Sequence, residues 1–251
     1  MSDRENRPIV PSGSPGDPGE PEPGVRPQRG PGEIAYIAPF AAFLILTTLE
    51  GPLVKMMGNG EAATYPVVYG IKIALVALVI WICRSTWRDL KAPSAAAALA
   101  AALTGLAATA LWIGLDGRYP ALPLTGPRQA FDPSELAPGT RGLFLAARFL
   151  GLVVLVPLLE ELFWRSFLVR WLDRSDFRSL PVGHVSLRSG LLTSVFFAIA
   201  HPEWLPGLLT GLLWALLLYK TRSVTACLIS HVMANLALGL YVVSRNAWHF
   251  W

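Results

Sequence analysis

Charged and polar side chains interrupt long apolar stretches at three places in this sequence. The first place holds Glu160, Glu161 and Arg165 among leucine, phenylalanine and valine residues. A charge at the centre of a membrane span costs about 2.5–3.5 kcal/mol on the insertion scale, so such side chains face the interior of a helix bundle and mark functional sites. These three residues are therefore the first candidates for chemistry.

Helix geometry separates the two glutamates. At about 100° per residue, Glu161 and Arg165 lie on one face as an i, i+4 pair, while Glu160 points about 100° away from Glu161. Arg165 is therefore expected to neutralise Glu161 and to leave Glu160 as an unpaired carboxylate, the kind of group that serves as a general base. The alternative is that all three residues form one structural cluster.

The second and third places carry His201 and the pair His231 and Asn235, which is also spaced i, i+4. A lone histidine in a membrane helix is often only a hydrogen bond between helices. Two histidines, an asparagine and a free glutamate on three helices favour one hydrolytic site instead. A rise of about 1.5 Å per residue puts Glu160, His201 and His231 at compatible depths near the bilayer midplane.

Metal chemistry is the alternative at the same residues. Glu160, His201 and His231 could bind zinc with a water as the fourth ligand. The sequence lacks the HExxH pattern, however, and asparagine is an uncommon zinc ligand. We therefore favour a glutamate mechanism that requires no cofactor and keep Zn²⁺ as the second possibility. Cys83 and Cys227 are expected to be small buried hydrophobes.

Composition indicates that membrane helices position these residues. Of the 251 residues, 53% are hydrophobic and only 15% are charged, and the mean hydropathy is +0.46. A soluble domain usually carries about a quarter of charged residues. The apolar residues form long blocks, and the basic residues sit in short loops between them, which indicates membrane topology and not nucleic-acid binding.

The blocks predict an all-α, polytopic transmembrane bundle of about seven helices, some of them short or kinked. The helices are expected at Ile34–Glu50, Pro66–Cys83, Ser94–Leu115, Leu143–Leu172, Leu187–His201, Gly207–Tyr219 and Ser223–Val243. Pro157 is expected to kink the fourth helix. The fifth and sixth are shorter than the roughly 17 residues that a span needs, so we expect this pair to turn within the membrane.

Charge in the loops predicts the orientation. Lys and Arg gather after the second, fourth and sixth helices, which puts the N-terminus in the cytoplasm. Residues 1–33, rich in Pro and Gly, are expected to be a disordered cytoplasmic tail, and residues 34–251 the membrane-embedded domain. Lys72 is expected to snorkel to the surface, and three tryptophans to be interfacial anchors. These are Trp171, Trp248 and Trp251. The loop at residues 116–141 is interpreted as a connector in preference to an outer cap.

Three motifs in this order resemble those of the CAAX-protease and bacteriocin-processing (CPBP, or Abi) intramembrane proteases. They are Glu160-Glu161-x-x-x-Arg165, Phe197-x-x-x-His201 and His231-x-x-x-Asn235. The resemblance implies an all-helical membrane endopeptidase with its motif core at residues 143–243. It implies that Glu160 and His201 activate water and that His231 and Asn235 stabilise the oxyanion. Glu161 and Arg165 would support the site. The family has long been labelled as metalloproteases.

A narrower resemblance concerns the segment 161–171, the stretch 221–223, and the ending 238–243 with Trp248-x-x-Trp251. These are similar to the CAAX-protease-related subgroup of bacterial exosortase systems. The similarity implies a multi-pass protein of the bacterial inner (plasma) membrane, with a protein substrate from an exosortase or sorting system and no nucleic-acid partner. It does not imply that the substrate is prenylated.

The residues thus predict an intramembrane endopeptidase that hydrolyses a membrane or lipid-associated protein. Two other functions remain open. A catalytically inactive scaffold or immunity protein would show no change when Glu160 is replaced by glutamine. A proton-coupled transporter would show flux in proteoliposomes and no peptide cleavage, because intramembrane glutamate and histidine also mark ion paths.

Overall fold

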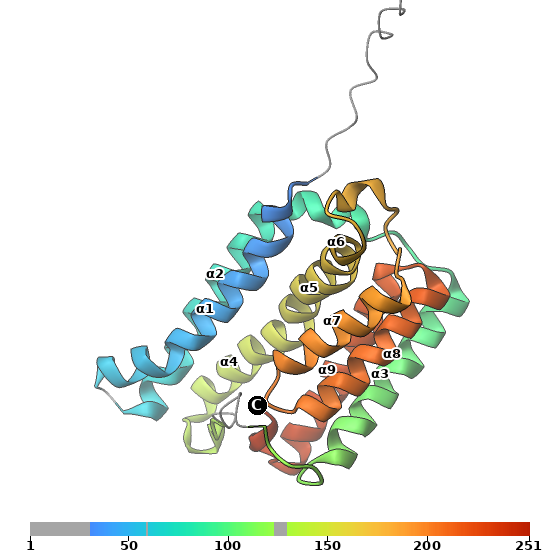
Figure 1. Ribbon diagram of the computed structural model, residues 1–251. Coiled ribbons are helices and arrows are strands. Elements are labelled where there is room, and N and C mark those ends of the chain that lie inside the picture. The colour runs from blue at the N-terminus through green and yellow to red at the C-terminus, as the bar shows by residue number, and fades with distance from the viewer. Residues whose placement is uncertain (1–30, 59, 123–129) are drawn as a thin grey trace, which may run out of the picture.

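A computed structural model describes residues 31–58, 60–122 and 130–251, and these form helices and connecting loops with no strand (Figure 1). The predicted all-α bundle is confirmed. Within the described ranges, five helical segments are long and apolar enough to cross a membrane. The predicted tail lies outside the described residues except at its last three positions, of which Glu33 already belongs to the first helix.

The helices follow one another with short connections. They are α1 (Glu33–Met57), α2 (Glu61–Ile82), α3 (Ala95–Leu115), α4 (Pro138–Phe149), α5 (Val156–Glu161), α6 (Val169–Asp173), α7 (Leu187–Ile199), α8 (Trp204–Thr221) and α9 (Val224–Arg245). Short 3₁₀ turns lie at Arg84–Asp89, Pro133–Glu135, Phe177–Ser179 and Trp248–Phe250.

The predicted fourth helix is one continuous rod from Pro138 to Asp173, made of α4, α5 and α6. Two π-helical turns join its three parts, η3 at Leu150–Leu155 and η4 at Leu162–Leu168. Each π turn changes the angle at which the following residues leave the rod, and such turns often occur at functional sites. The six residues of α5, which include Pro157, Glu160 and Glu161, lie between them.

Several predicted helix ends differ from the structure. The second helix begins at Glu61 and not at Pro66, and the fourth at Pro138 and not at Leu143. Two other differences have identifiable reasons. The first helix does not stop at Glu50 but continues to Met57 and ends at Gly58, whose φ is +68°. Glu50 is buried and forms an ion pair with Lys72 of α2 at 2.8 Å, so its charge does not terminate the span. The sixth helix begins at Trp204, since Pro206 is tolerated in a first turn.

The rod α4–α6 is the centre of the bundle. Figure 1 shows it between the pair α1 and α2 on one side and the group α3, α7, α8 and α9 on the other. The closest contacts in that group depend on glycine. A Cβ atom on Gly105 of α3 would lie 2.3 Å from the carbonyl oxygen of Ser230, and one on Gly211 of α8 would lie 2.9 Å from Cα of Ser194.

The loops rich in Lys and Arg lie at one end of the bundle. Figure 1 shows the start of α1, the α2–α3 connection, the α6–α7 loop and the α8–α9 turn at this end. The large apolar side chains exposed along the helices, such as Ile34, Ile45 and Leu99, are typical of lipid contact. Together these features describe a multi-pass membrane protein.

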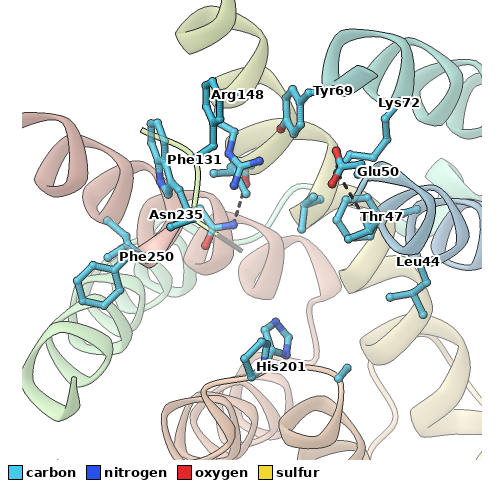
Figure 2. A pocket seen from close by; sticks show the side chains of 18 of the residues that line it. Leu44, Thr47, Glu50, Tyr69, Lys72, Phe131, Arg148, His201, Asn235 and Phe250 are labelled. Carbon is cyan, nitrogen blue, oxygen red and sulfur yellow. Dashed lines mark hydrogen bonds and ion pairs between the residues drawn. The ribbon is translucent and has the colours of Figure 1, made fainter. Parts of the chain in front are cut away.

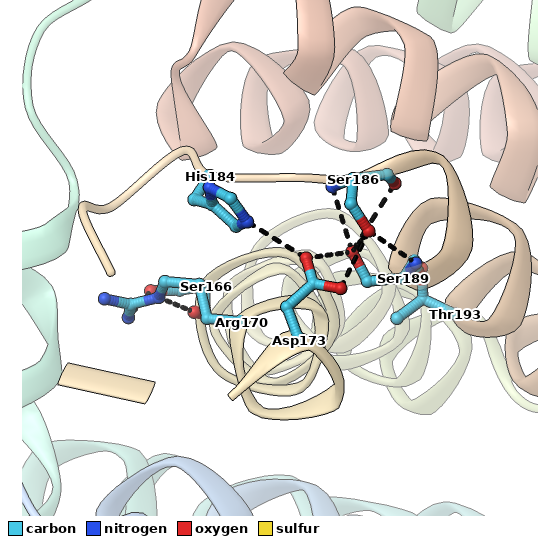
Figure 3. A network of polar contacts seen from close by, with 7 residues as sticks. All are labelled: Ser166, Arg170, Asp173, His184, Ser186, Ser189 and Thr193. Atoms are coloured by element: carbon cyan, nitrogen blue, oxygen red, sulfur yellow. Dashed lines mark hydrogen bonds and ion pairs between the residues drawn. The ribbon is translucent and has the colours of Figure 1, made fainter. Parts of the chain in front are cut away.

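Polar networks fix the charged end. The carboxylate of Asp173 accepts hydrogen bonds from Ser186 (2.7 Å) and Ser189 (2.8 Å) and contacts His184 (3.0 Å), which ties the end of the rod to the start of α7 (Figure 3). One turn earlier, Arg170 forms an ion pair with Asp89 at 3.2 Å. Arg170 is therefore buried in the bundle and does not belong to the exposed loop charges.

Candidate active site

The three motifs meet at one cavity of about 870 Å³. Its lining includes Glu160 from α5, His201 from the end of α7, and His231 and Asn235 from α9. Figure 2 shows His201 and Asn235 entering this space from different helices. Residues up to 75 positions apart in the sequence, from Glu160 to Asn235, are thus brought to a common space, as the motif spacing predicts.

Glu160 is the buried carboxylate of this cavity. Its side chain is 5% exposed, and no described residue forms a hydrogen bond with its Oε2 atom. The neighbouring Glu161 is fully buried and points elsewhere, as its contacts show below. A carboxylate that lines a cavity and has one oxygen without a protein partner is placed to bind a small molecule such as water.

Glu161 joins two motifs. Its Oε2 lies 3.4 Å from Nε of Arg165, and its Oε1 lies 2.9 Å from Nδ1 of His231. The predicted pairing of Glu161 with Arg165 is therefore confirmed, and the contact with His231 is an addition that the helix geometry did not predict. A carboxylate at Nδ1 fixes the orientation of the imidazole ring and directs its Nε2 edge.

Aromatic rings connect the remaining parts of the motifs. The guanidinium of Arg165 lies over the rings of Phe197 (4.8 Å) and Trp214 (5.0 Å). Phe197 in turn contacts the ring of His201, and Trp214 contacts the ring of His231, each at 4.3 Å between centroids. Arg165 is thus the centre of a packed array that holds both histidines, in addition to the counter-charge of Glu161.

His201 and Asn235 each have one side-chain group bound to backbone. Nδ1 of His201 lies 2.7 Å from the carbonyl oxygen of Phe197, and a carbonyl only accepts, so Nδ1 carries the proton. Nδ2 of Asn235 donates to the carbonyl oxygen of Leu152 at 2.7 Å, inside the π turn η3 (Figure 2). One N–H of the Asn235 amide is therefore used to join α9 to the rod, and the other remains as a donor.

Glu160, His201 and His231 are the residues that would hold a zinc ion. Among the described residues, no three His, Cys, Asp or Glu side chains form a group that could hold a metal ion. The three residues line one cavity, and the contact of Nδ1 of His231 with Glu161 leaves Nε2 as the nitrogen that could face a metal or a substrate.

The sequence analysis missed a second charged group on the cavity wall. Lys72, expected to snorkel to the surface, is buried between α1 and α2, and that prediction is wrong. The reason is the carboxylate of Glu50, which was interpreted as a helix end. Arg148 of α4 is also buried and lines the cavity. It lies within the predicted helix Leu143–Leu172, and a charge inside that apolar span was the signal that could have found it. For Glu50 and Lys72, the available signal was one charged residue of opposite sign on each of two neighbouring helices.

Two of the three tryptophans were also misplaced by the prediction. Trp248 and Trp251 are 6% and 4% exposed, so they are not interfacial anchors. Trp251 packs against Phe149 with its centroid 5.7 Å away and lines the cavity, whereas Trp171 is 42% exposed on the surface. The chain folds back after α9, and this return could not be inferred from residue type.

Comparison with protein families supports the motif assignment. Residues 142–237 match the family described as Type II CAAX prenyl endopeptidase Rce1-like. Comparisons with curated proteins and with solved structures gave no match. The matched segment contains all three motifs and is consistent with the CPBP family, and it does not address the exosortase subgroup. Residues 142–237 are thus similar to the Rce1-like type II CAAX prenyl endopeptidases, and this similarity supports an intramembrane protease.

Proposed function

We propose that the protein is an intramembrane endopeptidase that hydrolyses a peptide bond of a membrane or lipid-associated protein through water activated by Glu160 and His201. The observation that carries this proposal is the carboxylate of Glu160. It is buried, it has an oxygen without a described hydrogen-bond partner, and it shares a cavity with His201, His231 and Asn235.

The first step is water addition. Glu160 removes a proton from a water molecule in the cavity, and the oxygen of that water forms a bond with the carbonyl carbon of the scissile peptide. His201, whose Nδ1 donates to Phe197, presents Nε2 as the nitrogen that orients this water. The tightly packed surroundings of the carboxylate keep the reacting groups at fixed positions, which contributes to the rate.

The developing oxyanion needs hydrogen-bond donors. His231 donates through Nε2 only as an imidazolium, because its Nδ1 is directed at Glu161, and the Glu161 carboxylate is the counter-charge for that form. The second N–H of Asn235 is the other donor. Preorganised donors of this kind contribute about 2.7–4 kcal/mol each. Glu160 then returns its proton to the leaving nitrogen as the C–N bond breaks.

The test is cleavage by purified protein in lipid nanodiscs. As the probe we choose a fluorescent peptide ending in farnesyl-cysteine and three further residues, in line with the matched family description. Glu160→Gln keeps the size of the side chain and removes the base, so we expect cleavage to fall by at least about 10²-fold. Glu135→Gln, an exposed residue outside the cavity, is the matched control and should cleave normally.

Two results would contradict the proposal. Cleavage by the Glu160→Gln variant at the normal rate would exclude Glu160 as the base. Absence of cleavage in the unmodified protein, together with proton flux in proteoliposomes, would favour a transporter. If this probe is not a substrate, comparing polypeptide lengths in host membranes with and without Glu160→Gln identifies one that is.

A further inference from the structure

Arg148 is a buried cation of the cavity without a counter-ion. Its side chain is 8% exposed, and its Nη1 donates to the hydroxyl of Tyr65 at 3.2 Å. Its Nε has no hydrogen-bond partner, and no carboxylate of the described residues forms an ion pair with it. The other deeply buried cation of the lining, Lys72, is neutralised by Glu50 at 2.8 Å. The cavity therefore contains one guanidinium that forms no ion pair with a described side chain.

Aromatic rings surround this guanidinium. It lies over Tyr69 at 4.8 Å and near Trp251 at 5.7 Å, and the rings of Phe131 and Phe144 pack against the same tyrosines. Rings favour a cation and hold it in place. Apart from the Tyr65 hydroxyl, however, these residues supply no acceptor for the guanidinium, and a buried charge without a counter-charge is strongly unfavourable. An anion that enters the cavity would supply this acceptor.

We propose that Arg148 binds the C-terminal carboxylate of the peptide substrate. The planar guanidinium matches a carboxylate in size and donor geometry. The rings from α2, α4, the segment at Phe131 and the chain end at Trp251 crowd this side of the cavity, which suits the end of a chain better than a chain that continues. Figure 2 shows Arg148 and His201 on different sides of the space that a substrate would fill. This inference rests on the proposed endopeptidase function.

The spacing along the rod limits the fragment released. Arg148 precedes Glu160 by 12 residues, which is about 18 Å along a helix axis. An extended peptide covers about 3.5 Å per residue. Because this reach is a maximum, a substrate held by its terminal carboxylate at Arg148 needs about five extended residues to bridge the axial distance to Glu160, and fewer to the extent that the two side chains themselves reach toward each other. The enzyme would act on chain ends and not on internal loops.

The test is a binding measurement that does not depend on cleavage. The Glu160→Gln protein in nanodiscs of zwitterionic lipid is titrated with two fluorescent farnesyl-cysteine peptides that differ only in a free C-terminal carboxylate or a C-terminal amide. We expect the carboxylate form to bind about 10- to 100-fold more tightly, the range of a hydrogen bond between charged groups. Adding Arg148→Gln should remove this preference, and Arg148→Lys should retain part of it.

Arg141→Gln, seven residues earlier on the same helix and outside the cavity lining, is the matched control and should keep the full preference. Equal affinities for the two peptides, no binding of either, or a preference that persists in Arg148→Gln would overturn the proposal. The proposal would also be overturned if anionic lipid added to the nanodiscs displaced the carboxylate peptide and this displacement required Arg148. That result would assign the site to a lipid headgroup. A clear preference, together with cleavage by the Glu160→Gln protein at the normal rate, would leave this inference standing and refute the proposed role of Glu160 in hydrolysis.

Discussion

At the residue scale, the two adjacent glutamates have different surroundings. Glu160 lines the cavity and its Oε2 has no hydrogen-bond partner among the described residues, whereas Glu161 is fixed by Arg165 and His231. Exchanging the surroundings of the two glutamates would require the helix to rotate about its axis by about one residue, or 100°. The two carboxylates therefore have different roles because consecutive residues of a helix point about 100° apart around its axis.

Glu161→Ala should destabilise the protein strongly. It removes one member of a fully buried ion pair and leaves Arg165 with only aromatic partners, so we expect a loss of about 3–5 kcal/mol in unfolding free energy. Denaturant unfolding in detergent micelles measures this loss. Glu135→Ala, at an exposed carboxylate, should change stability by less than about 0.5 kcal/mol. Equal stability of the two variants would show that Arg165 does not depend on Glu161.

At the element scale, the close approach of α3 and α9 positions the helix that carries His231 and Asn235. Gly105 of α3 lies against the backbone of Ser230 and the side chain of Met233, with no room for a methyl group. The approach brings α9 to the rod, where Asn235 contacts the carbonyl of Leu152. The carbonyl oxygen of Leu152, in the π turn η3, thus accepts a hydrogen bond from a side chain of another helix.

Gly105→Ala and Gly114→Ala form a matched pair of variants on α3. At Gly105 the added Cβ would lie 2.3 Å from a carbonyl oxygen, so overpacking should cost about 1–3 kcal/mol. At Gly114 nothing lies within 4 Å, and alanine should be neutral or stabilise the helix by up to about 1 kcal/mol. Thermal unfolding followed by circular dichroism compares them. A stable Gly105→Ala protein would be inconsistent with the α3–α9 contact.

At the scale of the whole molecule, the loops with most Lys and Arg lie together at one end of the bundle (Figure 1). The positive-inside rule places that end in the cytoplasm. We therefore expect Arg174→Cys, in the α6–α7 loop, to react with a membrane-impermeant maleimide only after permeabilisation. Arg118→Cys, beyond the end of α3, should react in intact cells. Both side chains are exposed.

The background for this labelling should replace the two native cysteines, Cys83 and Cys227, which are buried. The opposite labelling pattern would place the N-terminus outside and reverse the predicted topology. Labelling of both positions in intact cells would argue against a bilayer-spanning arrangement of the rod.

The class of protein, the course of its helices and the three motifs could be predicted from the sequence. Each of these depends on local properties. Long uncharged blocks predict spans because their length matches the thickness of the bilayer. An i, i+4 spacing such as Glu161 with Arg165 predicts a contact within one helix because helical periodicity puts the two residues on one face.

Which side chains of different helices meet could not be predicted from the sequence and became visible in the folded bundle. The contact of Glu161 with His231, the pairing of Glu50 with Lys72, and the return of Trp251 to the cavity all depend on how each helix is rotated about its axis. The π turns at Leu150–Leu155 and Leu162–Leu168 change that rotation within the rod, and no short stretch of sequence specifies it. The place of Arg148 on the cavity wall depends on the same rotation.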